Sequence, residues 1–350
     1  MRNGLIRAVA GMLAIGWLTA AFAQDPAVNP READLAKQQQ ARQTAQPLNN
    51  QPVWSEVRSG MPQFTSIPGR ETNVLIQPQG QTWRAAHAQA ATIGGVLISI
   101  VLLGLLGYYA WRGSIELHGK PTGRLIQRFT PAKRLAHWAM GLSFVTLAIT
   151  GLIITFGKSL LLPLIGYTLF SWLATLAKTI HNFLSPVFSV ALLVFIVMFI
   201  ADNIPRAYDG KWLARFGGML DRSGKTHVPS GKFNAGEKAL FWGLVCFLCV
   251  LLVLSGYVLL FPNFDQTRST MQIANIVHIG AALLAIAMAC FHIYLGTVGM
   301  RGAFDAMRYG YVDEAWAKEH HEYWYNDVVA GKLPRGPEPA ATLPRSRFAV

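Results

Sequence analysis

Five long apolar stretches, almost free of charged side chains, constrain this chain more than any other feature of its sequence. Each stretch is long enough to cross the hydrocarbon core of a bilayer, about 30 Å thick, as a helix. Only 14% of the residues are charged, against roughly 25% in soluble globular proteins. We therefore expect an all-α integral membrane protein. The expected spans are 90–111, 135–156, 180–201, 239–261 and 273–300.

The distribution of basic residues predicts the orientation of these spans. The loops at 112–134 and 206–238 carry most of the lysines and arginines, whereas the other two loops carry only Lys158, Lys178 and Arg268. Basic loops stay in the cytoplasm. This places the mature N-terminus on the exported side and the tail at 301–350 in the cytoplasm. The net charge of +13 is explained in this way, and no nucleic-acid partner is expected.

A sixth apolar run, 160–176, contains Pro163 and Gly166. If it crossed the membrane, every later segment would be inverted and the basic loops would lie outside. We therefore expect this run to be an interfacial or re-entrant piece on the exported side.

The N-terminal region has the pattern of an exported protein. Residues 1–23 have a basic start, a short apolar centre and an Ala-x-Ala site that ends at Ala23, as in a cleaved signal peptide. Residues 24–89 are rich in Gln, Pro, Ala and Asn, and we expect an exported, partly disordered segment. Together these features predict a multi-pass protein of the bacterial inner membrane, with its mature N-terminus in the periplasm.

Four histidines lie within the apolar spans, where an ionisable side chain is costly and by default functional. His278 and His292 are fourteen residues apart, which in a helix means roughly 21 Å and nearly the same face. The predicted topology pairs His181 with His278 on the exported side, and His137 with His292 on the cytoplasmic side. Imidazoles on facing helices are common haem ligands. The pattern predicts a four-helix core at 135–300 that binds two b-type haems, with 90–111 as an additional span.

Other readings of these residues remain open. Proton relay in a transporter would need a polar path through mid-membrane, and a haemless anchor would make the histidines replaceable. No Cys-x-x-Cys-His motif indicates covalent haem, and Cys246 and Cys249 are interpreted as apolar packing. The adjacent His320 and His321 make a poor chelate, and we expect them to anchor the tail or to contact a partner.

Several segments resemble, in order and spacing, a known family. Four segments resemble the haem-binding segments of a cytochrome b556, the gamma subunit of membrane-bound formate dehydrogenase. They are Arg134-Leu-Ala-His137-Trp138, Ile180-His181, Ile276-Val-His278 and Phe291-His292-Ile-Tyr294. Its cytoplasmic segments resemble Asn203-Ile-Pro205, Lys232 to Lys238 and Trp316 to Trp324. The match covers roughly residues 129–325, and the order of the motifs is more specific than any one of them.

The resemblance implies an electron-transfer subunit, not the formate-oxidising one. The core would lie beside an iron–sulfur beta subunit, with a molybdenum or tungsten alpha subunit beyond it. His181 and His278 would ligate the entry haem, and His137 and His292 the exit haem. A hydrogenase or another molybdoenzyme is an alternative donor, because this chain carries no motif that tests formate specificity.

The resemblance also implies a quinone pocket beside the exit haem, at Asn234 and Gly236. The same residues have a structural interpretation, since Asn234 and Glu237 have the spacing of a capping box at a helix start. The two roles are compatible, because donors at a helix N-terminus can polarise a carbonyl oxygen. The first 110 or so residues have no counterpart in the shorter family members. We expect the additional span to pack at the periphery of the bundle or against a membrane helix of the partner.

Overall fold

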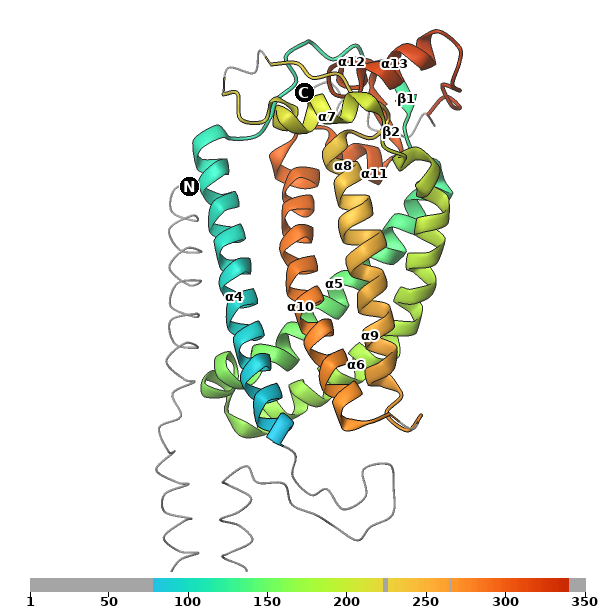
Figure 1. Cartoon of the computed structure of the whole chain (residues 1–350). Coiled ribbons are helices and arrows are strands. Elements are labelled where there is room, and N and C mark those ends of the chain that lie inside the picture. The colour runs from blue at the N-terminus through green and yellow to red at the C-terminus, as the bar shows by residue number, and fades with distance from the viewer. Residues whose placement is uncertain (1–77, 223–225, 265, 340–350) are drawn as a thin grey trace, which may run out of the picture.

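A computed structural model describes residues 78–222, 226–264 and 266–339, so the predicted signal peptide lies outside the described residues. Five helical rods in this part of the chain are long and apolar enough to cross a membrane, and they alternate in direction (Figure 1). The prediction of an all-α membrane protein is confirmed. The rods are α4 (Pro78–Arg112), α5 (Pro131–Leu160), α6 (Leu162–Phe199), the continuous run of α8 (Ala235–Leu240), the π-helical segment η3 (Phe241–Cys249) and α9 (Val250–Leu260), and α10 (Arg268–Tyr294) with the π-helical turn η4 (Leu295–Gly299).

Local sequence signals explain where these helices begin. The Thr130 side chain caps α5 and Pro131 follows in the first turn, where its missing N–H costs nothing. Thr267 caps α10 by accepting a hydrogen bond from the Thr270 amide at 3.1 Å. Each cap satisfies backbone donors that have no partner within the helix.

Helix α6 corrects one prediction from the sequence. The run 160–176 is not separate from the third span, because the helix that begins after Gly166 continues into that span. Gly166, with φ 76° and ψ 170°, interrupts the helix after its first turn, and the residues from 167 to 199 are helical without a further break. Pro186 lies within α6 and is tolerated, as prolines in membrane helices often are. Residues 167–199 alone form a helix about 50 Å long, so it must tilt or extend past the hydrocarbon core.

The additional helix α4 packs along α10. Ala91 and Ile98 of α4 share a buried cluster with Leu283 of α10. Gly94 makes this approach possible, because a Cβ there would lie 2.2 Å from the Leu283 side chain. The end of α4 is also tied down, since Ile115 exchanges backbone hydrogen bonds with residues just beyond α10. The helix therefore covers one side of the four-helix core.

A polar cap closes one end of the bundle, and it is built from loops that are far apart in the sequence (Figure 1). Strands β1 (Leu125–Gln127) and β2 (Tyr311–Asp313) pair antiparallel, with Ile126 opposite Val312. The other cap elements are η1 (Ile200–Asn203), α7 (Ala207–Ala214), η2 (Phe216–Gly218), α11 (Ala303–Arg308), α12 (Glu314–His320) and α13 (Glu322–Val329). These loops include the two that carry most of the basic residues.

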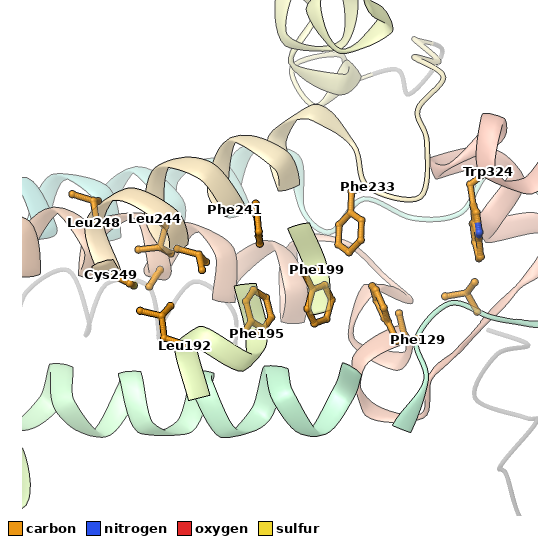
Figure 2. Close-up of a cluster of buried hydrophobic side chains, with 14 of the residues drawn as sticks. Phe129, Leu192, Phe195, Phe199, Phe233, Phe241, Leu244, Leu248, Cys249 and Trp324 are labelled. Atoms are coloured by element: carbon orange, nitrogen blue, oxygen red, sulfur yellow. The ribbon is translucent and has the colours of Figure 1, made fainter. Parts of the chain in front are cut away.

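A row of aromatic side chains joins the bundle to the cap (Figure 2). Phe195 and Phe199 stack at 4.3 Å on α6, and Phe129 lies 6.0 Å from Phe199 and 5.6 Å from Phe233. The row continues toward Trp324 of α13 (Figure 2). Aromatic burial of this kind makes the cap an extension of the core.

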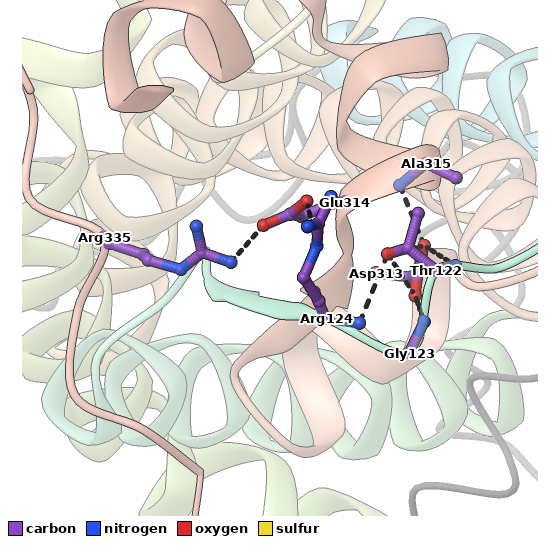
Figure 3. Close-up of polar contacts among 7 residues, drawn as sticks. All are labelled: Thr122, Gly123, Arg124, Asp313, Glu314, Ala315 and Arg335. Atoms are coloured by element: carbon purple, nitrogen blue, oxygen red, sulfur yellow. Dashed lines mark hydrogen bonds and ion pairs between the residues drawn. The ribbon is translucent and has the colours of Figure 1, made fainter. Parts of the chain in front are cut away.

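Buried carboxylates hold the cap segments together (Figure 3). Asp313 caps α12 by accepting a hydrogen bond from the Ala315 amide at 2.8 Å, and it also accepts from the amides of Thr122 and Gly123. Glu314 pairs with Arg124 at 2.9 Å and with Arg335 (Figure 3). The tail is therefore fastened to the segment that leads into β1.

Candidate functional site

The structure brings the four intramembrane histidines together in two pairs. The far pair, His181 of α6 and His278 of α10, lies away from the cap, and its ring centroids are 6.2 Å apart. The cap-side pair, His137 of α5 and His292 of α10, has centroids 6.1 Å apart. A metal–imidazole bond of roughly 2 Å, with each ring centre roughly 1.2 Å behind its nitrogen, would place two centroids about 6.4 Å apart. Both pairs therefore have the separation needed to hold a metal between them.

Hydroxyl groups orient both rings of the far pair. Thr150 Oγ1 lies 2.9 Å from Nδ1 of His181, and Ser255 Oγ lies 3.0 Å from Nδ1 of His278. Each hydroxyl donates its own hydrogen to a carbonyl of its own helix, at 2.9 Å for Thr150 and 2.7 Å for Ser255. A hydroxyl has a single hydrogen, so it must accept from the imidazole Nδ1–H. The lone pair of each ring is therefore on Nε2 and available to a metal.

A glycine follows each of these hydroxyl residues and leaves space for the imidazole ring against the helix. A Cβ at Gly151 would lie 3.4 Å from the His181 ring, and one at Gly256 would lie 3.3 Å from the His278 ring. Neither hydroxyl residue was identified as functional from the sequence. The sequence feature that could have identified them is a repeated dipeptide, a hydroxyl residue followed by glycine, in α5 and α9.

The cap-side pair has different surroundings. Nδ1 of His137 is buried and has no hydrogen-bond partner among the described residues, and the ring lies 5.4 Å from Trp138. Gly141 and Gly296 lie four residues beyond His137 and His292, on the same helix faces. A Cβ at either glycine would meet nothing within 4 Å. These small residues leave room for a broad, flat group beside the rings, so the donor set and its surroundings fit a haem.

Asn234 and Gly236 lie at the N-terminus of α8, at the cap end of the fourth span. The capping box is present, because Asn234 Oδ1 accepts from the Glu237 amide at 2.9 Å and Glu237 Oε2 accepts from the Asn234 amide at 2.8 Å. The Asn234 Nδ2 amide is not used by this cap. Gly236 packs against Trp212, since a Cβ at Gly236 would lie 2.9 Å from that ring.

His320 and His321 are part of the cap and anchor the tail. Nδ1 of His321 donates to the Gly231 carbonyl at 2.8 Å, and Ser230 Oγ donates to the His320 carbonyl at 2.7 Å. Burial lowers the pKa of His320 to about 4 and lowers that of His321 well below its ordinary value. Within the described residues no three or more His, Cys, Asp and Glu side chains are gathered so that they could hold a metal ion.

A bundle of membrane-spanning helices with facing imidazoles at two levels is the arrangement of a membrane-bound cytochrome b. The family model for prokaryotic cytochrome b561 matches residues 128–310, just over half of the chain, and the chain belongs to this family. The family implies a b-type haem and electron transfer through it. The additional helix α4 and everything before it lie outside the matched region.

Curated relatives include three cytochrome b556 subunits of formate dehydrogenases, so the resemblance noted in the sequence is confirmed. The chain is 27% identical to the cytochrome b556(Fdn) subunit of the nitrate-inducible formate dehydrogenase of Escherichia coli K12, over 59% of this chain and 92% of that subunit. It is 29% identical to the cytochrome b556(fdo) subunit of the same strain, over 58% and 93%. It is 28% identical to the cytochrome b556 subunit from Haemophilus influenzae, over 60% and 86%.

Proposed function

We propose that this chain is the membrane cytochrome b subunit of a respiratory formate dehydrogenase and passes electrons through two b haems to a quinone. The main support for the proposal is the presence of two facing histidine pairs, whose ring centroids are 6.2 and 6.1 Å apart. His181 and His278 hold one haem, and His137 and His292 hold the other. The haems supply reversible one-electron chemistry. The protein would place the two haems at different depths, and hydroxyl groups hold the rings of His181 and His278 in place.

The direction of transfer follows from the charges. The basic loops of the cap belong on the cytoplasmic side by the positive-inside rule, so the far pair is on the exported side of the inner membrane. An iron–sulfur beta subunit there delivers electrons to the haem at the far pair. A molybdenum or tungsten alpha subunit beyond it oxidises formate. The relatives, which are named as formate dehydrogenase subunits, support this assembly.

The quinone binds near the cap-side pair, beside Asn234 and Gly236. The Nδ2 amide of Asn234 is not used by the capping box and donates to a quinone carbonyl oxygen. Gly236 lies in the same first turn of α8, packed against the Trp212 ring. Protons taken from the cytoplasm during reduction would separate charge across the membrane.

The first experiment is a dithionite-reduced minus oxidised spectrum of the purified chain, with haem quantitation. We expect b-type bands and two haems per chain. His278→Ala and His292→Ala should each remove one haem. The control is His87→Ala, because that ring lies 5.7 Å from Trp83 in α4 and belongs to neither pair. A colourless protein, or full haem content in both variants, would overturn the proposal.

The donor is tested in native membranes. Formate should reduce both haems when the partner subunits are present, and reoxidation by added quinone should follow. If hydrogen reduced the haems and formate did not, the donor complex would be a hydrogenase and not a formate dehydrogenase.

A further inference from the structure

The two imidazole pairs differ in what their second nitrogens touch. Both rings of the far pair donate Nδ1–H to a hydroxyl, Thr150 for His181 and Ser255 for His278. In the cap-side pair, Nδ1 of His137 is buried without a partner among the described residues. A ligand's second hydrogen bond controls its basicity and its orientation. The two pairs therefore differ at His137, whose Nδ1 lacks the hydroxyl partner that both far-pair rings have.

Each of the two hydrogen bonds is built into a helix–helix contact. Thr150 lies on α5 and faces α6, and Ser255 lies on α9 and faces α10. Both hydroxyls are buried. Because each hydroxyl donates its hydrogen to a backbone carbonyl, the lone pairs of the hydroxyl oxygen face the imidazole. The same dipeptide chemistry, a hydroxyl residue followed by glycine, occurs in the two helical hairpins. Its repetition favours a shared role over incidental packing.

We propose that Thr150 and Ser255 are positioning residues that give the far-pair haem a lower midpoint potential than the cap-side haem. This inference rests on the proposed function. An imidazole that donates Nδ1–H gives more electron density to the metal through Nε2, which favours the oxidised iron and lowers the potential. With haems bound, this difference would favour electron transfer from the far pair to the cap-side pair. The hydroxyls thus bias transfer toward the quinone end.

The test is a spectroscopic redox titration of the purified, haem-loaded chain. The double variant Thr150→Val with Ser255→Ala removes both acceptors and keeps the side-chain volume of the first site. We expect two haems per chain and an upward shift in the midpoint potential of one of them. The ratio of reduced to oxidised haem at a fixed ambient potential should rise roughly tenfold for that haem. The other haem should not move.

Three further variants separate this effect from a structural one. Thr150→Ser and Ser255→Thr keep the hydroxyls and should restore the wild-type titration. Ser143→Ala is the matched control, because the Ser143 hydroxyl is buried in α5 and donates to the Ala139 and Met140 carbonyls instead of to an imidazole. It should leave both midpoints unchanged.

Assignment of the shifted haem uses a background that carries His292→Ala and retains only the far-pair haem. The shift should persist in this background. Two haems with unchanged midpoints in the double variant would overturn the inference and leave the proposed function standing. Equal shifts of both haems would also overturn it. A wild-type chain without haem would overturn the proposed function itself.

Discussion

The guanidinium of Arg128 lies 2.9 Å from the carboxylate of Glu237, and this ion pair joins the end of β1 to the capping box of α8. The Arg128 side chain is only 4% exposed. It lies between 5.0 and 5.5 Å from the ring centres of Phe129, Phe233 and Trp316. The pair therefore links the candidate quinone site to the cap through a buried charge.

Loss of this arginine should destabilise the protein strongly. Arg128→Ala removes the ion-pair partner of Glu237. It also removes the guanidinium that packs among the three aromatic rings. Loss of a charge-assisted hydrogen bond costs roughly 1.5–3 kcal/mol, which together with the lost aromatic contacts should appear as a clear drop in the apparent melting temperature in detergent. Arg128→Lys should not restore it, because an ammonium group cannot replace the planar fork and its stacking.

The matched control for Arg128 is Arg301→Ala. Arg301 pairs with Glu116 at 3.1 Å, but both side chains are more than half exposed. Exposed pairs contribute about 0–1 kcal/mol, so the melting temperature should hardly change. Similar losses in the two variants would show that burial of the Arg128 pair does not matter.

Glycine at position 236 is predicted to be required by packing. In Gly236→Ala the new Cβ would meet the Trp212 ring at 2.9 Å and Asn234 Oδ1 at 3.2 Å. Overpacking of this kind typically costs about 1–3 kcal/mol. Gly210→Ala in α7 meets nothing within 4 Å, and it should stabilise by roughly 0.5–1 kcal/mol. Thermal unfolding of the two variants would contradict this prediction if Gly236→Ala were as stable as the wild type.

Two substitutions at Asn234 separate its capping role from the proposed quinone contact. Asn234→Ala removes the acceptor for the Glu237 amide and should cost roughly 1 kcal/mol of stability. Asn234→Asp keeps the acceptor, but loses the Nδ2 donor. Both variants should slow haem reoxidation by quinone roughly tenfold, measured by stopped flow after reduction. If haem reoxidation were normal in Asn234→Asp, Asn234 would have only the helix-capping role and no contact with the quinone.

Acid should destabilise the cap through its buried histidines. Burial lowers the pKa of His320 from its ordinary value near 6.5 to about 4, against the attraction of Glu319 and with help from Arg128, His118 and His227. Between these two pH values the unfolded chain binds more protons than the folded one. Stability is therefore full above about pH 6.5 and falls by about 3 kcal/mol as the pH drops toward 4.

The measurement is the apparent melting temperature between about pH 8 and about pH 4. His320→Gln, which stays neutral throughout, should flatten the profile. His321 remains in that variant and should keep a residual slope, because burial lowers its pKa as well. A profile in His320→Gln as steep as that of the wild type would contradict the assignment.

Much of this molecule was predictable because the bilayer limits what an apolar chain can do. The lengths of the apolar runs were sufficient to predict five spans and an all-α fold. Helical periodicity and the alternation of spans were sufficient to place His181 with His278 and His137 with His292, the same rings that the structure brings together. The Asn–Glu spacing was also sufficient to predict the capping box of α8.

The prediction of a piece at 160–176 separate from the third span was wrong, because Gly166 interrupts the helix only after its first turn and the residues that follow are continuous with the span. The choice of hydroxyl partners depended on the rotation of α5 and α9 about their axes, which only tertiary packing sets. The cap depended on contacts such as Arg128 with Glu237, between segments more than a hundred residues apart. Depth along a membrane helix is a property of the sequence, because rise per residue and bilayer thickness are constants. Which face meets which neighbour is decided by the fold, because it depends on all the side chains between the helices at once.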